Sequence, residues 1–284
     1  MDVKPVAAWD QLAEAWDMLM GTPGNDYYTA VELPALERLV QPKPGDCALD
    51  LATGNGLVAH WMAQKGTSVL ATDGSPVMLT KAQARQSKRL KENGEAKVSY
   101  QILDVTDPQH FEELIQSRGP GAGGAFDIIT MNMAIMDVST LEHLANALPK
   151  LLKRDGGRFV ATLLHPLFTC GVTRAVEYRD NPESGREEAF HTLKMTKYLD
   201  VPSYKGVATQ SQPYPQIISA LPCLYFHRPM QEIFAPFFKA GLVLDALEEP
   251  NFDEAYVKAR DLDIGSLRQF TQFPKILAFR MKIA

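Results

Sequence analysis

Short apolar runs alternate with segments of helical pattern from Cys47 to Leu164, and this alternation constrains the fold more than any other feature. The apolar runs have the length of buried strands, and they lie at 47–51, 68–72, 98–103, 126–131 and 157–164. The helical segments between them lie at 57–64, 76–91, 109–116 and 141–152. Strands that alternate with helices predict a parallel sheet covered by helices on both faces, a Rossmann-like, doubly wound α/β fold.

The segments on either side of this alternation predict a cap and an insertion. Residues 1–45 read as helical, because Trp9, Leu12 and Trp16 share one helix face. From 165 to 228 the chain is rich in proline and tyrosine and too long for a simple loop. We expect residues 1–284 to form a single domain, with a helical cap at 1–45 and a substrate-covering insertion at 165–228. A helix at 230–240 and two strands at 242–248 and 275–282, paired antiparallel, would close it.

Composition argues against several classes of protein. The net charge of −5 disfavours a nucleic-acid partner, because phosphate binding requires a basic surface. No apolar run reaches the roughly 18 residues of a membrane span, and the first residues lack a signal-peptide pattern. Cys47, Cys170 and Cys223 are far apart, which disfavours disulfides and a zinc site. We therefore expect a cytoplasmic protein with no nucleic-acid partner, no membrane span and no structural zinc site, and the sequence leaves its oligomeric state open.

Acidic residues follow successive predicted strands, at the edge where doubly wound sheets bind ligands. The first strand ends at Asp50 and enters the turn Gly54-Asn55-Gly56, where glycines let the backbone approach a ligand closely. The helix that follows points its amide groups at the same ligand. Asp73 ends the second strand, where a carboxylate suits two ribose hydroxyls. Asp104 follows the third strand and could accept from an adenine amino group, with Val105 beside the ring. Together these residues predict a nucleotide-cofactor site.

The same residues resemble the ordered motifs of class I S-adenosylmethionine (SAM)-dependent methyltransferases. The resemblance covers most of the chain, and it includes the strand 126–132. Further segments are similar to a small-molecule subgroup near the ubiquinone/menaquinone-biosynthesis type: Trp9, 16–17, 24–28, 34–36, 132–137, 165–168 and 226–229. One departure is visible at Ala52, where the family more often has glycine. The resemblance implies a seven-stranded, mostly parallel sheet with one antiparallel strand, and methyl transfer that yields S-adenosylhomocysteine.

The resemblance also implies a set of cofactor-binding residues. The turn from Asp50 to Gly56 would hold the methionine end of SAM, Asp73 the ribose and Asp104 the adenine. Tyr27 and Tyr28 would close over the cofactor. The complete predicted set is Tyr27, Tyr28, Asp50, Ala52, Thr53, Gly54, Asn55, Gly56, Asp73, Gly74, Met78, Asp104, Val105, Asn132 and Met133.

Methyl transfer displaces a neutral leaving group, so it needs alignment and exclusion of water rather than an acid or a metal. A general base helps only where the nucleophile holds its proton tightly. His165, directly after the fifth strand, is the first candidate base and His227 the second, although either histidine could be structural. For the substrate pocket we predict Met136, Phe168, Tyr225 and Arg228; Arg228 could instead tie the insertion to the sheet.

Three alternatives use the same residues. A nicotinamide dehydrogenase would explain the glycine turn, but Asp50 would repel a pyrophosphate and the chain has no Tyr-x-x-x-Lys pair. A methyltransferase fold can also use SAM non-reactively, for example in a pericyclic or isomerisation step. A macromolecular substrate is disfavoured, because Met133 follows Asn132 where base and peptide-amide methyltransferases carry an Asn-Pro-Pro-Tyr signature.

Overall fold

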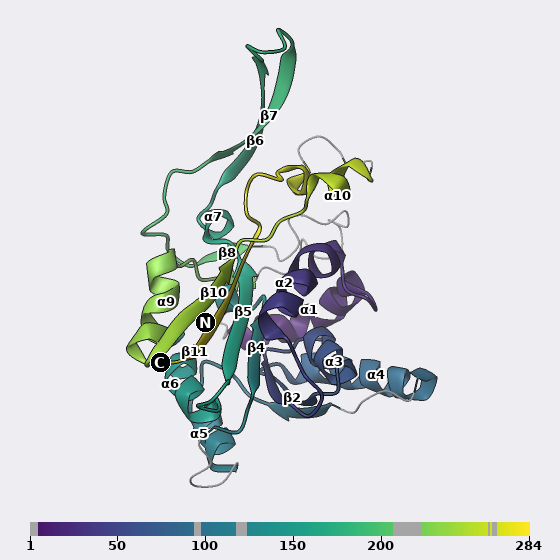
Figure 1. Ribbon diagram of the computed structural model, residues 1–284, viewed down its shortest axis with the longest axis vertical. Helices are drawn as coiled ribbons and strands as arrows, with labels where there is room; N and C mark the ends of the chain where they lie inside the picture. Colours follow the sequence, from purple (N-terminus) through teal and green to yellow (C-terminus); the bar gives the residue numbers. More distant parts are fainter. Residues whose placement is uncertain (1–4, 94–97, 118–123, 207–222, 261, 263–265) are drawn as a thin grey trace.

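A computed structural model of the protein describes the chain except residues 1–4, 94–97, 118–123, 207–222, 261 and 263–265. Its centre is a seven-stranded sheet in the order β10-β11-β5-β4-β1-β2-β3 (Figure 1). The strands are β1 (Cys47–Leu51), β2 (Ser68–Asp73), β3 (Ser99–Ile102), β4 (Ile128–Asn132), β5 (Arg158–Leu164), β10 (Leu242–Glu248) and β11 (Ile276–Ile283). Strand β11 runs antiparallel to both of its neighbours, β5 and β10, and the other neighbouring pairs in this sheet are parallel. The predicted mostly parallel sheet is confirmed.

Helices cover both faces of the sheet because adjacent residues of a buried strand point to opposite sides. Leu49 and Leu51 of β1 belong to the core under α5, α6 and α9, whereas Ala48 belongs to the core under α2 and α3. Strand β5 alternates in the same way, with Phe159 in the first core and Val160 in the second. The helices are α2 (Leu33–Val40), α3 (Leu57–Gln64), α4 (Pro76–Asn93), α5 (Pro108–Ser117), α6 (Glu142–Leu151) and α9 (Met230–Lys239).

The first part of the chain forms the predicted helical cap. Helix α1 (Pro5–Met20) packs against α4, and a short π-helix, η1 (Tyr28–Glu32), leads directly into α2. Asn25 starts η1 by accepting the Tyr28 amide on its side-chain oxygen at 2.9 Å. Short π-helical turns occur often at functional sites, because they push one side chain out of helical register.

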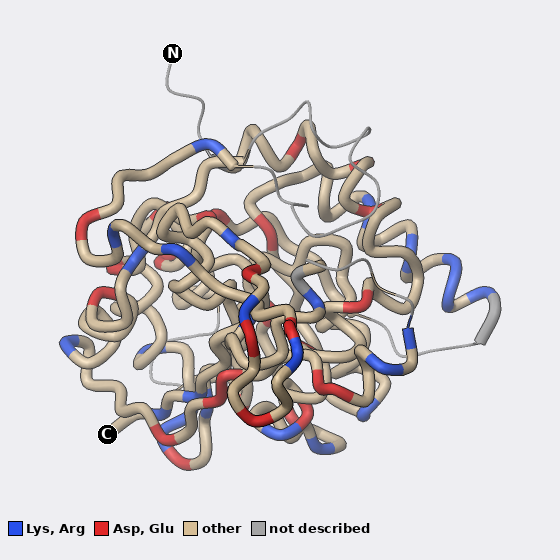
Figure 2. Tube along the Cα trace, turned by 90° about the horizontal axis from the view of Figure 1, so that it is seen from above, with Lys and Arg blue, Asp and Glu red and all other residues tan. Residues whose placement is uncertain are grey.

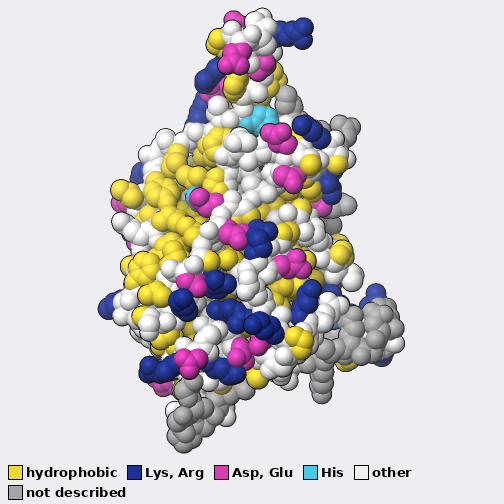
Figure 3. Space-filling view, in the orientation of Figure 1, with side chains coloured by type: hydrophobic (Ala, Val, Ile, Leu, Met, Phe, Trp, Pro, Cys, Tyr) yellow, Lys and Arg dark blue, Asp and Glu magenta, His cyan; other side chains and the backbone are white. Residues whose placement is uncertain are grey.

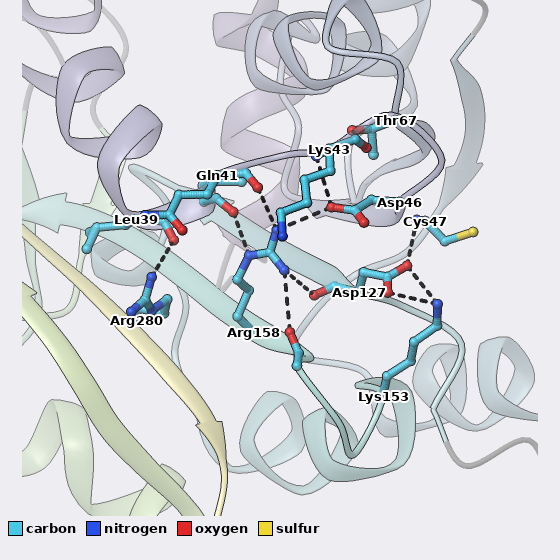
Figure 4. Close-up of polar contacts among 12 residues, drawn as sticks. Leu39, Gln41, Lys43, Asp46, Cys47, Thr67, Asp127, Lys153, Arg158 and Arg280 are labelled. Carbon is cyan, nitrogen blue, oxygen red and sulfur yellow. Dashed lines mark hydrogen bonds and ion pairs between the residues drawn. The ribbon is translucent and has the colours of Figure 1, made fainter.

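A polar cluster fastens the amino ends of the central strands to α2 (Figure 4). Arg158 donates to the carbonyl oxygens of Val40 and Gln41 and pairs with Asp46. Asp127 accepts the Cys47 amide at 2.9 Å and pairs with Lys153 at 2.8 Å. Burial alone would raise the pKa of the Asp127 carboxyl, but this amide and the Lys153 ammonium hold it below its ordinary value. This end of the sheet is therefore built for stability, opposite the ligand edge.

The insertion contains more regular structure than its composition predicts. After α7 (Pro166–Thr169), strands β6 (Thr173–Asp180) and β7 (Glu187–Lys194) form a hairpin that projects away from the body (Figure 1). Strands β8 (Tyr204–Gly206) and β9 (Cys223–Tyr225) pair with each other, and β9 packs against α1 and the 3₁₀ turn η2 (Ile135–Asp137). The part of the insertion around β9 thus lies beside the edge of the sheet where ligands are expected to bind. The β6–β7 hairpin points away from that edge.

The closing strands are antiparallel, as predicted, and two short helical segments between them were not predicted. These are α10 (Glu254–Lys258) and η3 (Leu267–Gln269). Asp253 caps α10 by accepting the Tyr256 amide. A helix of little more than one turn repeats no apolar spacing, so periodicity does not reveal it.

The surface mixes charge and apolar patches. Acidic and basic residues are interspersed along the trace when the molecule is seen from above (Figure 2). Apolar side chains gather over α9 and β10 (Figure 3), where Phe238 and Leu247 are exposed. The three cysteines are free thiols. None of the helices in the described part of the chain has the length and hydrophobicity that crossing a bilayer requires.

Candidate active site

A cavity lies where the carboxyl ends of β1, β2, β3 and β4 meet helix α1 and the π-helix η1. The empty space within the cavity and its open mouth together measures about 1150 Å³. Its position is the one where doubly wound sheets bind ligands. On the α1 side, its wall is formed by Val6, Trp9, Trp16 and Met20.

The Asp50 side chain stabilises the glycine turn that follows β1. The carboxyl is buried and accepts two hydroxyls at 2.6 Å, from Thr53 in the turn and from Thr130 on β4. Burial raises its pKa to about 6, against the effect of these two hydrogen bonds. Since each carboxyl oxygen already has a hydroxyl donor, Asp50 holds the turn in place as well as lining the cavity.

The backbone of this turn explains the departure at Ala52. Ala52, Gly54 and Gly56 all have positive φ, at 51°, 57° and 84°. An L-residue pays roughly 1–2 kcal/mol in this region, and glycine does not. Alanine is therefore tolerated at 52 at a cost, which is the physical reason for a glycine preference there.

Asp73 and Asp104 lie on the other side of the same cavity. Asp73 accepts two backbone amides at 2.8 Å, from Gly54 and Ser75, and burial raises its pKa to about 6. Asp104 accepts the amide and hydroxyl of Thr106. Each carboxylate oxygen has more than one lone pair, so both side chains retain capacity for a ligand. The structure thus brings Asp50, Asp73 and Asp104 to one cavity.

At the end of β4 the cavity has a second acidic wall. Asn132 accepts the Thr162 hydroxyl and donates to Glu32 of η1 at 3.1 Å. Glu32 is almost completely buried, and burial raises its pKa to about 7 despite that hydrogen bond. Met133 follows with φ at 52°, a left-handed conformation that few non-glycine residues adopt. The sequence analysis did not identify Glu32 as a site residue. The one signal in the sequence is that Glu32 is a lone carboxylate between apolar neighbours in a helical segment.

Asp137 completes this wall. It is buried in η2 and lines the cavity, and burial raises its pKa well above the ordinary value. Arg228 fixes the backbone around it, donating to the carbonyl oxygens of Ile135 at 3.2 Å and Val138 at 2.7 Å. The Phe226 amide donates to the carbonyl oxygen of Met136 at 2.8 Å. Arg228 therefore ties the insertion to the strand tip, which is one of the two roles that the sequence left open.

The two predicted base candidates are both engaged elsewhere. His165 accepts the Leu167 amide on Nδ1, so Nε2 carries the proton and donates to Glu249 at 2.9 Å. His227 contacts a carbonyl oxygen, that of Tyr198, through Nε2, so Nδ1 is left to accept the Thr169 hydroxyl. Burial lowers the pKa of His165. Neither ring is among the described residues that line the cavity, and their base role stays a prediction.

Most of the predicted cofactor residues reach the cavity. Those that line it are Tyr28, Asp50, Ala52, Thr53, Gly54, Asn55, Asp73, Gly74, Met78, Asp104, Val105, Asn132 and Met133. Tyr27 and Gly56 are not part of this lining; the ring of Tyr27 packs edge-on against Phe252. The predicted substrate residues also lie outside the described lining: Met136, Phe168, Tyr225 and Arg228.

The lining suits SAM along its whole length. The Asp73 carboxylate can accept ribose hydroxyls, and Met78, Leu103 and Val105 offer apolar contact for a purine. The positive-φ turn brings its backbone close to the ligand, next to the amino end of α3. The acidic lining complements a ligand that carries a sulfonium and an ammonium group.

Comparison with known proteins agrees with this site. Residues 49–159 match the family model described as a methyltransferase domain. Over 122 residues the chain is 30% identical to the ubiquinone/menaquinone biosynthesis C-methyltransferase of Zymomonas mobilis, an alignment that covers 43% of this chain and 44% of the relative. The chain thus matches less than half the length of that curated relative.

Solved structures show the same fold over nearly the whole chain. A SAM-dependent methyltransferase from Mesorhizobium loti superposes with a TM-score of 0.62 at 19% identity, covering 92% of this chain and 99% of that one. A putative SAM-dependent methyltransferase from Listeria monocytogenes gives 0.61 at 17% identity, covering 89% and 96%. The fold is that of the SAM-dependent methyltransferase structures on which the chain superposes. Residues 49–159 belong to the methyltransferase domain family.

Proposed function

We propose that the protein transfers a methyl group from SAM to a small-molecule acceptor. The observation that carries this proposal is the gathering of Asp50, Asp73 and Asp104 around one cavity at the strand tips. The methyltransferase domain match over residues 49–159 supports the same reaction. The match also disfavours a nicotinamide dehydrogenase and gives no reason to prefer non-reactive use of SAM.

When bound, SAM supplies a methyl carbon made electrophilic by the sulfonium. The residues of this chain would hold SAM, align it with the acceptor and shield the reacting atoms from water. Asp73 would hold the ribose, and the turn around Gly54 would hold the methionine end. Trp9 and Trp16 of α1 pack edge to face and form part of the wall, which would keep water from the reacting atoms.

A small acceptor is favoured by the shape of the site. The cavity lies between the strand tips and the α1–η1 cap, so an acceptor must fit beneath that cap. We propose that the insertion 165–228 covers the acceptor from the β9 side, since β9 packs against both α1 and η2. We further propose that the protein acts in the cytoplasm as a single domain, as the sequence predicts.

The direct test is calorimetric titration of SAM and S-adenosylhomocysteine into the purified protein, followed by mass spectrometry of reactions with candidate acceptors. We expect saturable binding of both nucleosides and formation of S-adenosylhomocysteine that depends on the acceptor. Product formation while SAM stays intact would favour the non-reactive alternative, and absence of SAM binding would refute the proposal.

A further inference from the structure

The ionisable lining of the cavity is almost entirely acidic. Among the described residues that line it are five carboxyl groups and no lysine, arginine or histidine; the carboxyls belong to Glu32, Asp50, Asp73, Asp104 and Asp137. Arg85 on α4 lies outside this lining and is already paired with Asp17 of α1. When these carboxyls are ionised, the cavity attracts cations and repels anions.

The five carboxyls divide into two groups by their place on the sheet. Asp50 and Asp73 lie at the carboxyl ends of β1 and β2, and Asp104 follows β3. These strands are adjacent and form the proposed nucleoside side. Glu32 and Asp137 lie at β4, on the opposite side of β1. The second pair therefore lies away from the proposed ribose and adenine contacts, on the side that we assign to the acceptor.

Asp137 is a buried carboxyl with an unmet hydrogen bond. Asp137 is only 7% exposed, and its Oδ1 atom has no hydrogen-bond partner among the described residues. Leaving such a group unpaired costs about 1–3 kcal/mol. The backbone on both sides of it is nevertheless fixed by Arg228 and Phe226. A costly group held in a defined position and facing a cavity is the arrangement expected of a ligand contact.

Glu32 faces the same end of the cavity from η1. It is 4% exposed, and its Oε2 accepts from Asn132. Burial raises the pKa of both carboxyls, and neither has a cationic partner among the described residues. A ligand cation between them would supply the missing partner for both.

We propose that Glu32 and Asp137 bind a basic nitrogen, so that the methyl acceptor is an amine rather than a carboxylate or phosphate. An ammonium group has N–H donors for both carboxyls, and its charge offsets theirs. Before methyl transfer, one of the two carboxylates would take a proton from the ammonium. The freed nitrogen lone pair would then form the N–C bond as the methyl–sulfur bond of SAM breaks, and S-adenosylhomocysteine would leave as a neutral thioether. An anionic acceptor would be repelled by the same wall. This inference rests on the proposed methyl transfer, because it assigns the β4 side to the acceptor.

A first experiment compares matched compounds that differ in one functional group. Protein saturated with S-adenosylhomocysteine is mixed with phenethylamine, 2-phenylethanol or phenylacetate, and with tryptamine, indole-3-ethanol or indole-3-acetate. Thermal unfolding then reports binding to the folded state. We expect the amines to raise Tm most and the carboxylates least. An equal response in all three classes, including no response in any, would overturn the inference, as would a preference for the carboxylates.

A second experiment takes the better amine into calorimetry with variants. We expect Asp137→Asn and Glu32→Gln each to weaken amine binding at least tenfold while leaving S-adenosylhomocysteine affinity within threefold. Asp155→Asn makes the same chemical change at an exposed turn and should leave both affinities unchanged. Unchanged amine affinity in Asp137→Asn would contradict the assignment.

The two proposals fail in different ways. If the nucleosides do not bind the wild-type protein, the proposed function is wrong. If they bind normally but amines show no advantage, only the acceptor class is wrong. Folding of each variant is checked by circular dichroism, because S-adenosylhomocysteine affinity is itself one of the predicted outcomes.

Discussion

Asp73 Oδ2 lies 2.8 Å from the amide nitrogen of Gly54, which joins the tip of β2 to the glycine turn after β1. The other oxygen of the same carboxyl accepts the Ser75 amide at 2.8 Å. One side chain therefore shapes the proposed ribose site and also fixes the turn that would hold the rest of the cofactor.

Asp73→Ala should consequently affect both binding and stability. We expect SAM affinity to fall at least tenfold, because a hydrogen bond to a charged group contributes about 1.5–3 kcal/mol. The free energy of unfolding should fall by about 1–3 kcal/mol, because two amides lose their acceptor. Calorimetry and urea unfolding measure the two effects. Unchanged SAM affinity would remove Asp73 from the cofactor site.

Ala52→Gly should stabilise the protein. The left-handed conformation of Ala52 costs roughly 1–2 kcal/mol, and the extra freedom of glycine in the unfolded chain offsets about 0.4–1 kcal/mol of that. We expect a net gain of about 0.5 kcal/mol or more in urea unfolding. The same substitution at Ala84, exposed on helix α4, should instead destabilise by about 1 kcal/mol. A loss of stability at position 52 would show that the φ of Ala52 carries no such cost.

Glu32→Gln should change how stability depends on pH. The pKa of Glu32 is raised from 4.5 to about 7, so the folded state binds more protons than the unfolded state between these values. Wild-type stability is therefore lost across this window as pH rises, whereas the variant has no carboxyl to titrate there. The variant should gain about 1 kcal/mol or more relative to wild type on going from pH 4 to pH 8.

Urea unfolding at intervals from pH 4 to pH 8 would measure this difference. Glu112→Gln, an exposed site on α5, is the matched control for loss of one carboxyl. A stability difference between Glu32→Gln and wild type that stays constant with pH would show that Glu32 is not held in a strongly desolvated state.

His165→Asn distinguishes a base from a structural group. Both ring nitrogens of His165 are already hydrogen-bonded, Nδ1 to the Leu167 amide and Nε2 to Glu249. We therefore expect the variant's turnover at pH 8 to fall less than tenfold. Its Tm should fall measurably, because these hydrogen bonds are lost. General-base catalysis typically contributes about 10²–10⁴-fold. A hundredfold or larger loss of turnover at unchanged SAM affinity would establish the base role that the sequence position predicts.

The sequence predicted the sheet well because its signals are local. The strands around Asp50, Asp73 and Asn132 are short apolar runs bounded by turns, and the helices between them repeat an apolar spacing. Parallel strands place their carboxyl ends at one edge. The convergence of the acidic strand tips on one cavity therefore followed from chain order alone.

Side-chain partners are a different kind of fact, because they depend on residues that are distant in sequence. Glu32 meets Asn132 across 100 positions, and His165 meets Glu249 across 84. No spacing rule predicts these pairs. The sequence by itself determined the α/β fold and the edge of the sheet at which the acidic strand tips meet. Only the tertiary structure decided which carboxyls face the cavity and which histidines are already hydrogen-bonded, because burial and pairing arise when separate elements pack together.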